Sequence, residues 1–142
     1  MARGERVFVA LGSNLGDRAQ WLTLARERLA GLPETTLVRA SSVEETVPLG
    51  DVPQGPYLNQ MVELETGLEP QALLDACLGI ETALGRVRTV RWGPRQIDLD
   101  IVRYGGRRIS TGTLTVPHPE LSHRPFWRRE LTELQDLVPE DS

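Results

Sequence analysis

A mixed α+β fold is predicted by three features of this 142-residue sequence. Two stretches, Tyr57–Glu65 and Ile97–Ile101, alternate apolar and polar residues with the period of a half-buried strand. The apolar run Val7–Leu11 has the length of a buried strand. Residues 19–32 and 70–84 instead space their apolar side chains at the period of a helix. Strands and helices therefore occur together in one chain.

The first half of the chain is expected to form a strand, a helix and a second strand. After Val7–Leu11 comes a turn that ends at Asp17, whose side chain can cap a helix over Ala19–Leu32. Thr36–Ala40 is then predicted to be a strand. Residues 43–56 are turn-rich and too polar for a core, so we interpret them as a long loop. Such a loop could close over a ligand or could be a plain connection.

The second half is expected to repeat this order and to add a C-terminal extension. The predicted elements are a strand at Tyr57–Glu65, a helix opened by Pro70, a strand at Asp98–Tyr104, short strands at Arg107–Ile109 and Leu114–Val116, and a helix at Trp127–Asp136. The order strand-helix-strand-strand-helix-strand indicates a ferredoxin-like α+β fold with an added hairpin and helix. Because this fold hosts many functions, function must be argued from the site.

Composition limits the classes of function. We expect one domain over residues 1–142 from the length of the chain, and we expect a monomer. A cytoplasmic location is expected because no stretch resembles a signal peptide or a membrane span. The formal net charge of -4 argues against nucleic acid as a partner. All 16 basic residues are arginine, which excludes Walker-type and protein-kinase mechanisms, since both place a lysine on phosphates. The one cysteine, Cys77, is expected to be a small core residue.

The stretch Arg86–Arg103 carries the strongest chemical signal. Asp98 and Asp100 are two residues apart on a predicted strand, so their side chains share a face. Two carboxylates that close repel each other unless a cation neutralises them, and Mg²⁺ binds such groups together with substrate phosphates. Four arginines that suit phosphate oxygens precede them: Arg86, Arg88, Arg91 and Arg95. This combination indicates nucleotide-dependent phosphoryl chemistry, whereas the alternative is an exposed strand face with surface ion pairs.

Residues 91–102, Arg91-Trp-Gly-Pro-Arg95-x-x-Asp98-Leu-Asp100-Ile-Val102, resemble the signature of the 6-hydroxymethyl-7,8-dihydropterin pyrophosphokinase family of folate biosynthesis. Shorter elements resemble the same family: Gly12-Ser-Asn-Leu15, Thr46-x-Pro48-Leu49-Gly50, Tyr57-Leu-Asn59, Pro117-His118 and Arg124-Pro-Phe126. The resemblance implies that pyrophosphate passes from ATP to the hydroxymethyl group of the pterin, with two Mg²⁺ ions as cofactors. The implied partners are therefore small molecules.

The resemblance also implies roles for individual residues. The catalytic residues would be Arg86, Arg95, Asp98 and Asp100, with the two aspartates as metal ligands. The ATP-binding residues would be Glu81, Arg88, Trp92, Arg95, Ile101, Thr115, His118 and Arg124. The pterin-binding residues would be Thr46, Pro48, Leu49, Tyr57, Asn59 and Phe126, with the pterin stacked between the rings of Tyr57 and Phe126. The chain departs from the family after Phe126, where residues 127–131 replace an apolar segment that contains proline.

Two other functions are compatible with parts of the sequence. A Mg²⁺-dependent phosphohydrolase could use the same aspartate pair and would release phosphate or pyrophosphate without an acceptor. A non-catalytic nucleic-acid-binding module on a ferredoxin-like fold would need strand aromatics and a basic face. The chain has only two Phe and two Tyr, and its net charge is negative, so the second alternative is the weaker one.

Overall fold

The computed structural model describes residues 4–47, 55–84 and 97–136. Within these residues the main element is an antiparallel sheet in the strand order β2-β4-β1-β5, with the short β3 also paired to β4. The strands are β1 (Glu5–Ser13), β2 (Thr35–Ala40), β3 (Glu44–Thr46), β4 (Tyr57–Thr66) and β5 (Asp98–Tyr104). Strand β5 therefore forms one edge of the sheet.

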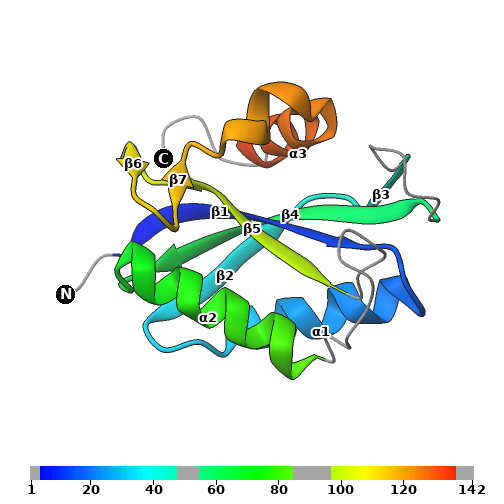
Figure 1. Cartoon of the computed structure of the whole chain (residues 1–142), viewed down its shortest axis with the longest axis horizontal. Coiled ribbons are helices and arrows are strands. Elements are labelled where there is room, and N and C mark those ends of the chain that lie inside the picture. The colour runs from blue at the N-terminus through cyan, green and yellow to red at the C-terminus, as the bar shows by residue number, and fades with distance from the viewer. Residues whose placement is uncertain (1–3, 48–54, 85–96, 137–142) are drawn as a thin grey trace.

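The helices lie on both faces of this sheet (Figure 1). Helices α1 (Arg18–Ala30) and α2 (Pro70–Ala83) cover one face, and α3 (Pro125–Asp136) lies on the other. Between β5 and α3 the chain forms a small hairpin, β6 (Ile109–Ser110) and β7 (Thr115–Val116), and a 3₁₀ helix, η1 (Pro119–His123). Helix α3 lies over only part of the face that carries it.

Two apolar clusters hold these layers together. The larger one lies between the sheet and helices α1 and α2, and includes Leu22, Ala25 and Leu29 of α1, Leu73, Cys77 and Ile80 of α2, and Val7, Val9 and Leu11 of β1. The smaller one lies under α3, where Trp127, Leu131 and Leu134 pack against Phe8, Ala10, Met61 and Val102. Successive residues of β1 thus alternate between the two clusters, as the pleat of a strand requires. The prediction that Cys77 is a core residue is confirmed, since it is 1% exposed.

Local signals explain where the helices begin and end. The Asp17 carboxylate accepts a hydrogen bond from the Gln20 amide at 3.2 Å, which confirms the predicted N-cap of α1. Helix α1 ends at Ala30, two residues before the expected end, and Gly31 is its C-cap. Pro70 occupies the first turn of α2, as predicted. The expected cap at Gly85 lies outside the described residues.

The α+β class is confirmed, whereas the ferredoxin-like detail stays a prediction. Two expectations were wrong. The segment 43–56 was expected to be only a loop, but it contains β3, and the strand predicted at Arg107–Ile109 is instead β6, at Ile109–Ser110. Helix α3 begins at Pro125, two residues before the predicted start. No helix in the described part of the chain is long and apolar enough to cross a membrane.

Candidate active site

The two aspartates lie on the edge strand β5, as the sequence predicted. In the register with β1, Asp98 is opposite Gly12 and Asp100 is opposite Ala10. Both aspartates therefore lie on the face of the sheet that also carries α3, and the prediction that they share a face is confirmed. The residues opposite them are the smallest available, so the sheet leaves space next to the carboxylates. The side chain of Asp100 is 39% exposed.

His118 faces Asp100 from the start of η1. Its Nε2 lies 3.8 Å from Asp100 Oδ1, and its Nδ1 accepts a hydrogen bond from the Glu120 amide at 3.0 Å. Since Nδ1 accepts, the proton of the neutral ring is on Nε2 and points toward the carboxylate. The ring also meets Trp127 edge-on, with centroids 5.0 Å apart. Burial lowers the pKa of His118, and the Asp100 carboxylate opposes this shift.

Asp100 is placed where a cation would stabilise it. Burial raises the pKa of this carboxyl, and the nearby His118 and Arg124 act in the opposite direction. The Arg124 guanidinium lies 4.6 Å from the centre of the Trp127 ring, which holds this charge near the site. Hard carboxylate oxygens, two residues apart on one open face, are ligands that Mg²⁺ prefers. The residues that are present therefore fit the divalent cation that the sequence analysis expected.

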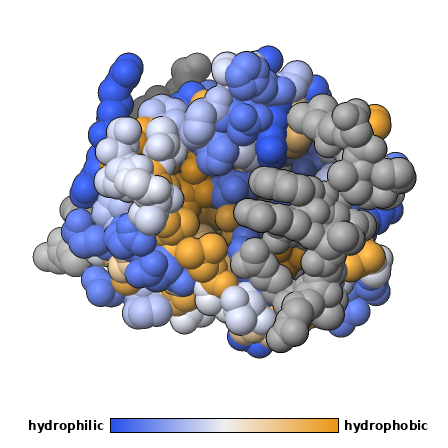
Figure 2. Space-filling model, viewed as in Figure 1, coloured by the Kyte–Doolittle hydropathy of each residue, from blue (hydrophilic) through white to orange (hydrophobic). Residues whose placement is uncertain are grey.

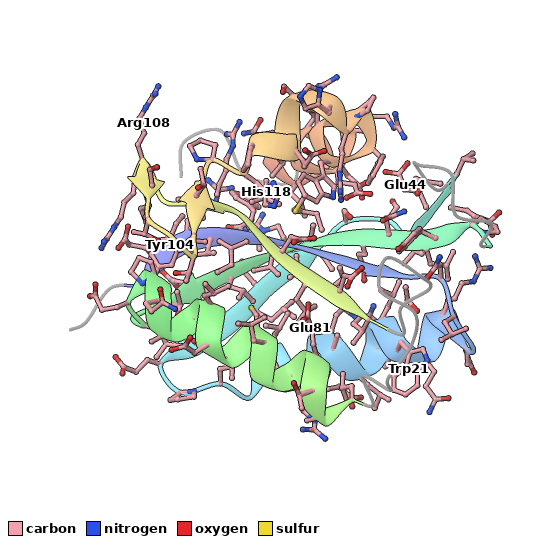
Figure 3. All side chains as sticks on the ribbon, viewed as in Figure 1. Trp21, Glu44, Glu81, Tyr104, Arg108 and His118 are labelled. Carbon is pink, nitrogen blue, oxygen red and sulfur yellow. The ribbon has the colours of Figure 1, made fainter. Side chains whose placement is uncertain are left out.

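Glu81 supports the aspartate strand from the opposite side. Its carboxylate, on α2, accepts a hydrogen bond from the Leu99 amide at 2.7 Å, and Leu99 stands between the two aspartates. Figure 3 shows Glu81 on the side of β5 that faces α2 and His118 on the side that faces α3. Glu81 is 8% exposed, so this acceptor is buried against β5, the edge strand of the described sheet. The contact helps to fix the position of Asp98 and Asp100.

A cavity of about 260 Å³ opens beside Asp100, between α2, β5 and the β6–β7 hairpin. It brings together three residues that the resemblance assigned to ATP: Ile101, Thr115 and His118. The lining also includes residues that the sequence analysis did not single out: Leu74, Leu99, Thr111, Gly112, Thr113, Leu114 and Pro119. Figure 2 shows apolar surface in the hollow between the hairpin and α2. An apolar floor with hydroxyl groups at the rim suits a flat, partly polar ring.

Thr113 helps to hold the hairpin over this cavity. Its hydroxyl donates a hydrogen bond to Gln71 Oε1 at 2.9 Å, which ties the β6–β7 turn to the first turn of α2. No periodicity in the sequence could reveal this cavity, because its walls come from three separate elements. The sequence did offer one signal for the cavity: Ile101 follows Asp100 on the same predicted strand.

The residues assigned to the pterin gather on the face of the sheet that carries the two aspartates. A Cβ on Gly12 would lie 3.3 Å from Asn59 Oδ1 and 3.5 Å from Tyr57 Cδ2, so these side chains border Gly12 directly. The Asn59 amide donates a hydrogen bond to Thr46 Oγ1 at 2.5 Å. The three residues are therefore brought together, and Gly12 provides the space between them and Asp98. The sequence analysis noted Gly12 as part of a motif but gave it no role.

Phe126 lies in the first turn of α3, on this same face of the sheet. It is partly buried against the smaller cluster, and its ring is 6.4 Å from that of Trp127. Six of the residues that the sequence analysis assigned to the site lie outside the described residues: Pro48, Leu49, Arg86, Arg88, Trp92 and Arg95. The described residues thus place the carboxylate pair and the aromatic and amide groups on one face of the sheet, with the cavity opening beside Asp100 at the β5 edge.

This chain is similar to known proteins over most of its length. The family model described as 7,8-dihydro-6-hydroxymethylpterin-pyrophosphokinase (HPPK) matches residues 8–136. A protein from Methylorubrum extorquens named 2-amino-4-hydroxy-6-hydroxymethyldihydropteridine pyrophosphokinase is 45% identical over 134 residues, which cover 94% of this chain and 85% of the relative. Relatives of the same name from Bacillus subtilis and Pseudomonas aeruginosa are each 42% identical, cover 95% and 96% of this chain, and are themselves covered over 81% and 82% of their length.

Proposed function

Because the chain belongs to the 7,8-dihydro-6-hydroxymethylpterin-pyrophosphokinase family, we propose that it transfers pyrophosphate from ATP to 6-hydroxymethyl-7,8-dihydropterin. The acceptor is the hydroxymethyl group, and the products are AMP and the pterin diphosphate of folate biosynthesis. The observation that carries this proposal is the position of the aspartate pair, which stands between the Tyr57–Asn59 pair on the same face of the sheet and the cavity that opens beside Asp100 at the β5 edge.

The cavity beside Asp100 is the proposed site of the nucleotide base. Ile101 would contact the flat face of the base, while Thr115 and His118 offer a hydroxyl and a ring N–H at the rim. Arg124 would add positive charge next to the phosphates, because it already lies near Asp100 and His118. Glu81 would act indirectly here, through its bond to the Leu99 amide.

The pterin is proposed to lie between Tyr57 and Phe126. Ring stacking would hold its flat faces, and the Asn59 side chain, oriented by Thr46, would bond to its polar edge. We assign Pro48 and Leu49 to the same ligand on the basis of the resemblance. This arrangement would hold the hydroxymethyl group on the side of Gly12 where Asp98 and Asp100 stand.

The chemical step needs no covalent intermediate. The hydroxymethyl oxygen forms a bond to the β-phosphorus, the bond from that phosphorus to the oxygen of the α-phosphate breaks, and AMP leaves, while the hydroxyl proton passes to solvent. Asp98 and Asp100 would hold two Mg²⁺ ions, which when bound neutralise charge on the phosphate oxygens. Arg86 and Arg95 are assigned to the developing charge at the β-phosphate, and Arg88 and Trp92 to ATP. Positioning and charge stabilisation can account for catalysis of this type.

We also propose an oligomeric state, a location and a class of partner for the protein. We propose that it works as a monomer of one domain in the cytoplasm, where its substrate ATP is available. Small molecules are its proposed partners, and the net charge of -4 gives no reason to expect nucleic acid.

The proposal is tested by incubating the protein with ATP, Mg²⁺ and the reduced pterin alcohol and measuring AMP. AMP should appear only when all three are present, and in equal amount to the pterin diphosphate. Release of phosphate or pyrophosphate without the pterin would instead identify a phosphohydrolase. Absence of any ATP turnover would contradict both.

A further inference from the structure

Two side chains of α3 contact the chain where β3 begins. Arg129 Nη2 lies 2.8 Å from Glu44 Oε1. Glu133 Oε2 accepts hydrogen bonds from the Ser42 amide at 2.8 Å and from the Ser42 hydroxyl at 2.9 Å. Together with Glu130, these residues form what we call the β3–α3 junction: Ser42, Glu44, Arg129, Glu130 and Glu133. The junction lies away from the cavity, at the start of β3, where Figure 3 labels Glu44.

Glu130 is the unusual member of this junction. It is only 2% exposed, and neither of its carboxyl oxygens has a hydrogen-bond partner of good geometry in the described part of the chain. Its carboxyl group nevertheless faces that of Glu44 closely enough for each to change the pKa of the other. An isolated buried carboxylate would be very costly, so a proton on Glu130 that is shared with Glu44 is the arrangement that burial favours.

The pKa of the Glu130 carboxyl agrees with a proton that is shared with Glu44. Burial first, and then the proximity and negative charge of the Glu44 carboxylate, raise the pKa of Glu130 to about 9. Glu133 adds to the shift, and Arg129 opposes it. At neutral pH the group therefore remains protonated and can donate to the Glu44 carboxylate, which also binds Arg129.

The junction connects directly to the proposed pterin site. In the register of β3 with β4, Glu44 is opposite Asn59, and Thr46 is opposite Tyr57. A shift of Glu44 would carry Thr46 with it and weaken the bond that orients the Asn59 amide. Phe126 stands one helical turn before Glu130 on α3. A single rigid helix thus supports both sides of the proposed stacking site.

We propose that Glu130 is a positioning residue for the pterin: by donating to Glu44 it fixes β3 on α3 and so sets the Thr46–Asn59 pair. This inference rests on the proposed function, because it assumes that Thr46 and Asn59 orient the acceptor. A purely structural role for Glu130 would not distinguish the use of pterin from the use of ATP. The effect should appear in the use of pterin and not in the use of ATP, since the proposed nucleotide cavity is formed by α2, β5 and the hairpin.

The first test compares Glu130→Gln and Glu130→Ala with the control Gln135→Ala, which changes an exposed residue of the same helix. Gln keeps a neutral donor for Glu44, so the KM for pterin should stay within about twofold of the wild type at pH 7.5, as in the control. Ala removes the donor, and we expect the KM for pterin to rise about tenfold, because small displacements in a site are costly. The KM for ATP should change less than about twofold in all variants, because the cavity is not displaced.

The second test uses pH and does not depend on the Ala variant folding. Above pH 9 the wild-type Glu130 ionises, and its charge repels Glu44. The KM for pterin of the wild type, divided by that of Glu130→Gln, should therefore rise between pH 8 and pH 10. The ratio removes any titration of the pterin itself, and the same ratio for ATP should stay flat.

The outcomes separate the two proposals. A wild-type protein that forms no AMP would overturn the proposed function, and this inference with it. AMP formation with a pH-independent pterin ratio, or with equal changes in the KM for pterin and for ATP, would overturn the inference alone. A selective and pH-dependent change in pterin use would support it.

Discussion

The open space beside Asp98 and Asp100 comes from two small residues on the neighbouring strand. Gly12 and Ala10 stand opposite them on β1, so no bulky neighbour fills the face that the two carboxylates share. Glu81 holds the intervening Leu99 amide from behind. The two carboxylates are therefore fixed along the strand yet open on one side, as metal ligands must be.

We predict that Asp98→Ala or Asp100→Ala abolishes AMP formation but leaves the fold intact. Loss of a charge-neutralising ligand removes several kcal/mol of transition-state stabilisation, which corresponds to a decrease in kcat of roughly a thousandfold. The fold should survive because Asp100 is 39% exposed and neither side chain belongs to a core cluster. AMP assays and circular dichroism on the same preparations measure both effects. Near-normal activity of either variant would contradict the metal-binding role.

We predict that Phe126→Ala weakens binding of the pterin more than binding of ATP. The ring is partly buried at the start of α3, on the face that carries Tyr57 and Asn59. Loss of an aromatic partner beyond its buried area costs about 0.5–1.5 kcal/mol, which is up to roughly a tenfold loss in affinity. Calorimetric titration with each ligand separately measures the two affinities. Equal losses for both ligands would count against the stacking assignment.

At the scale of the element, α2 serves the core and the site together. Its buried side contributes Leu73, Cys77 and Ile80 to the larger cluster, while Leu74 lines the cavity and Glu81 bonds to β5. Adjacent positions of one helix thus perform different tasks, because the helix crosses the edge of the sheet at β5. Movement of α2 would affect the cavity and the aspartate strand at the same time.

We predict that Leu73→Ala strongly destabilises the protein and that Leu78→Ala on the same helix does not. Leu73 is 0% exposed, and a buried Leu→Ala change costs about 2–5 kcal/mol. Leu78 is 46% exposed, so its replacement should change the free energy of unfolding by less than about 0.5 kcal/mol. Urea unfolding of the two variants and the wild type measures both values. Similar losses for the two variants would show that α2 is not packed as described.

The elements that the sequence predicted well are those whose pattern is long. Strands β4 and β5 and helices α1 and α2 each repeat their period several times, so their type was correct; the bounds of β5 were also correct, and the ends of the others shifted by a residue or two. The three residues of β3 were missed because Glu44, Glu45 and Thr46 have no strand pattern of their own. Pairing with Asn59, Leu58 and Tyr57 makes them a strand, and this pairing depends on the fold.

At the scale of the whole molecule, the site also combines features that the pattern of one strand predicts with features that depend on the fold. Spacing along one strand was enough to predict that Asp98 faces the same way as Asp100, and Tyr57 the same way as Asn59. The cavity could not be predicted this way, because Leu74, Thr111 and Leu114 meet only when α2 and the hairpin fold against β5. The burial of Glu130 could not be predicted this way either, because its charged neighbours on the helix, Arg128 and Arg129, are exposed.

Glu130 should also make the stability of the whole molecule depend on pH. The folded protein keeps the proton on Glu130 up to a pKa of about 9, whereas the ordinary pKa of the group is 4.5. Between these values the folded state binds one more proton than the unfolded state, so the contribution of Glu130 to stability is complete at low pH and is lost as the pH rises. Gln at this position does not titrate.

We therefore predict that Glu130→Gln becomes more stable relative to the wild type as the pH rises from 5 to 8. Each unit contributes at most about 1.4 kcal/mol, and we expect the free energy of unfolding of the variant to gain roughly 2–4 kcal/mol over this range. Urea unfolding at pH 5, 6.5 and 8 measures the difference, with Gln135→Ala as a control that neither titrates nor removes a buried group. A difference that is the same at all three pH values would mean that Glu130 is ionised in the folded protein, with its charge balanced by Arg129.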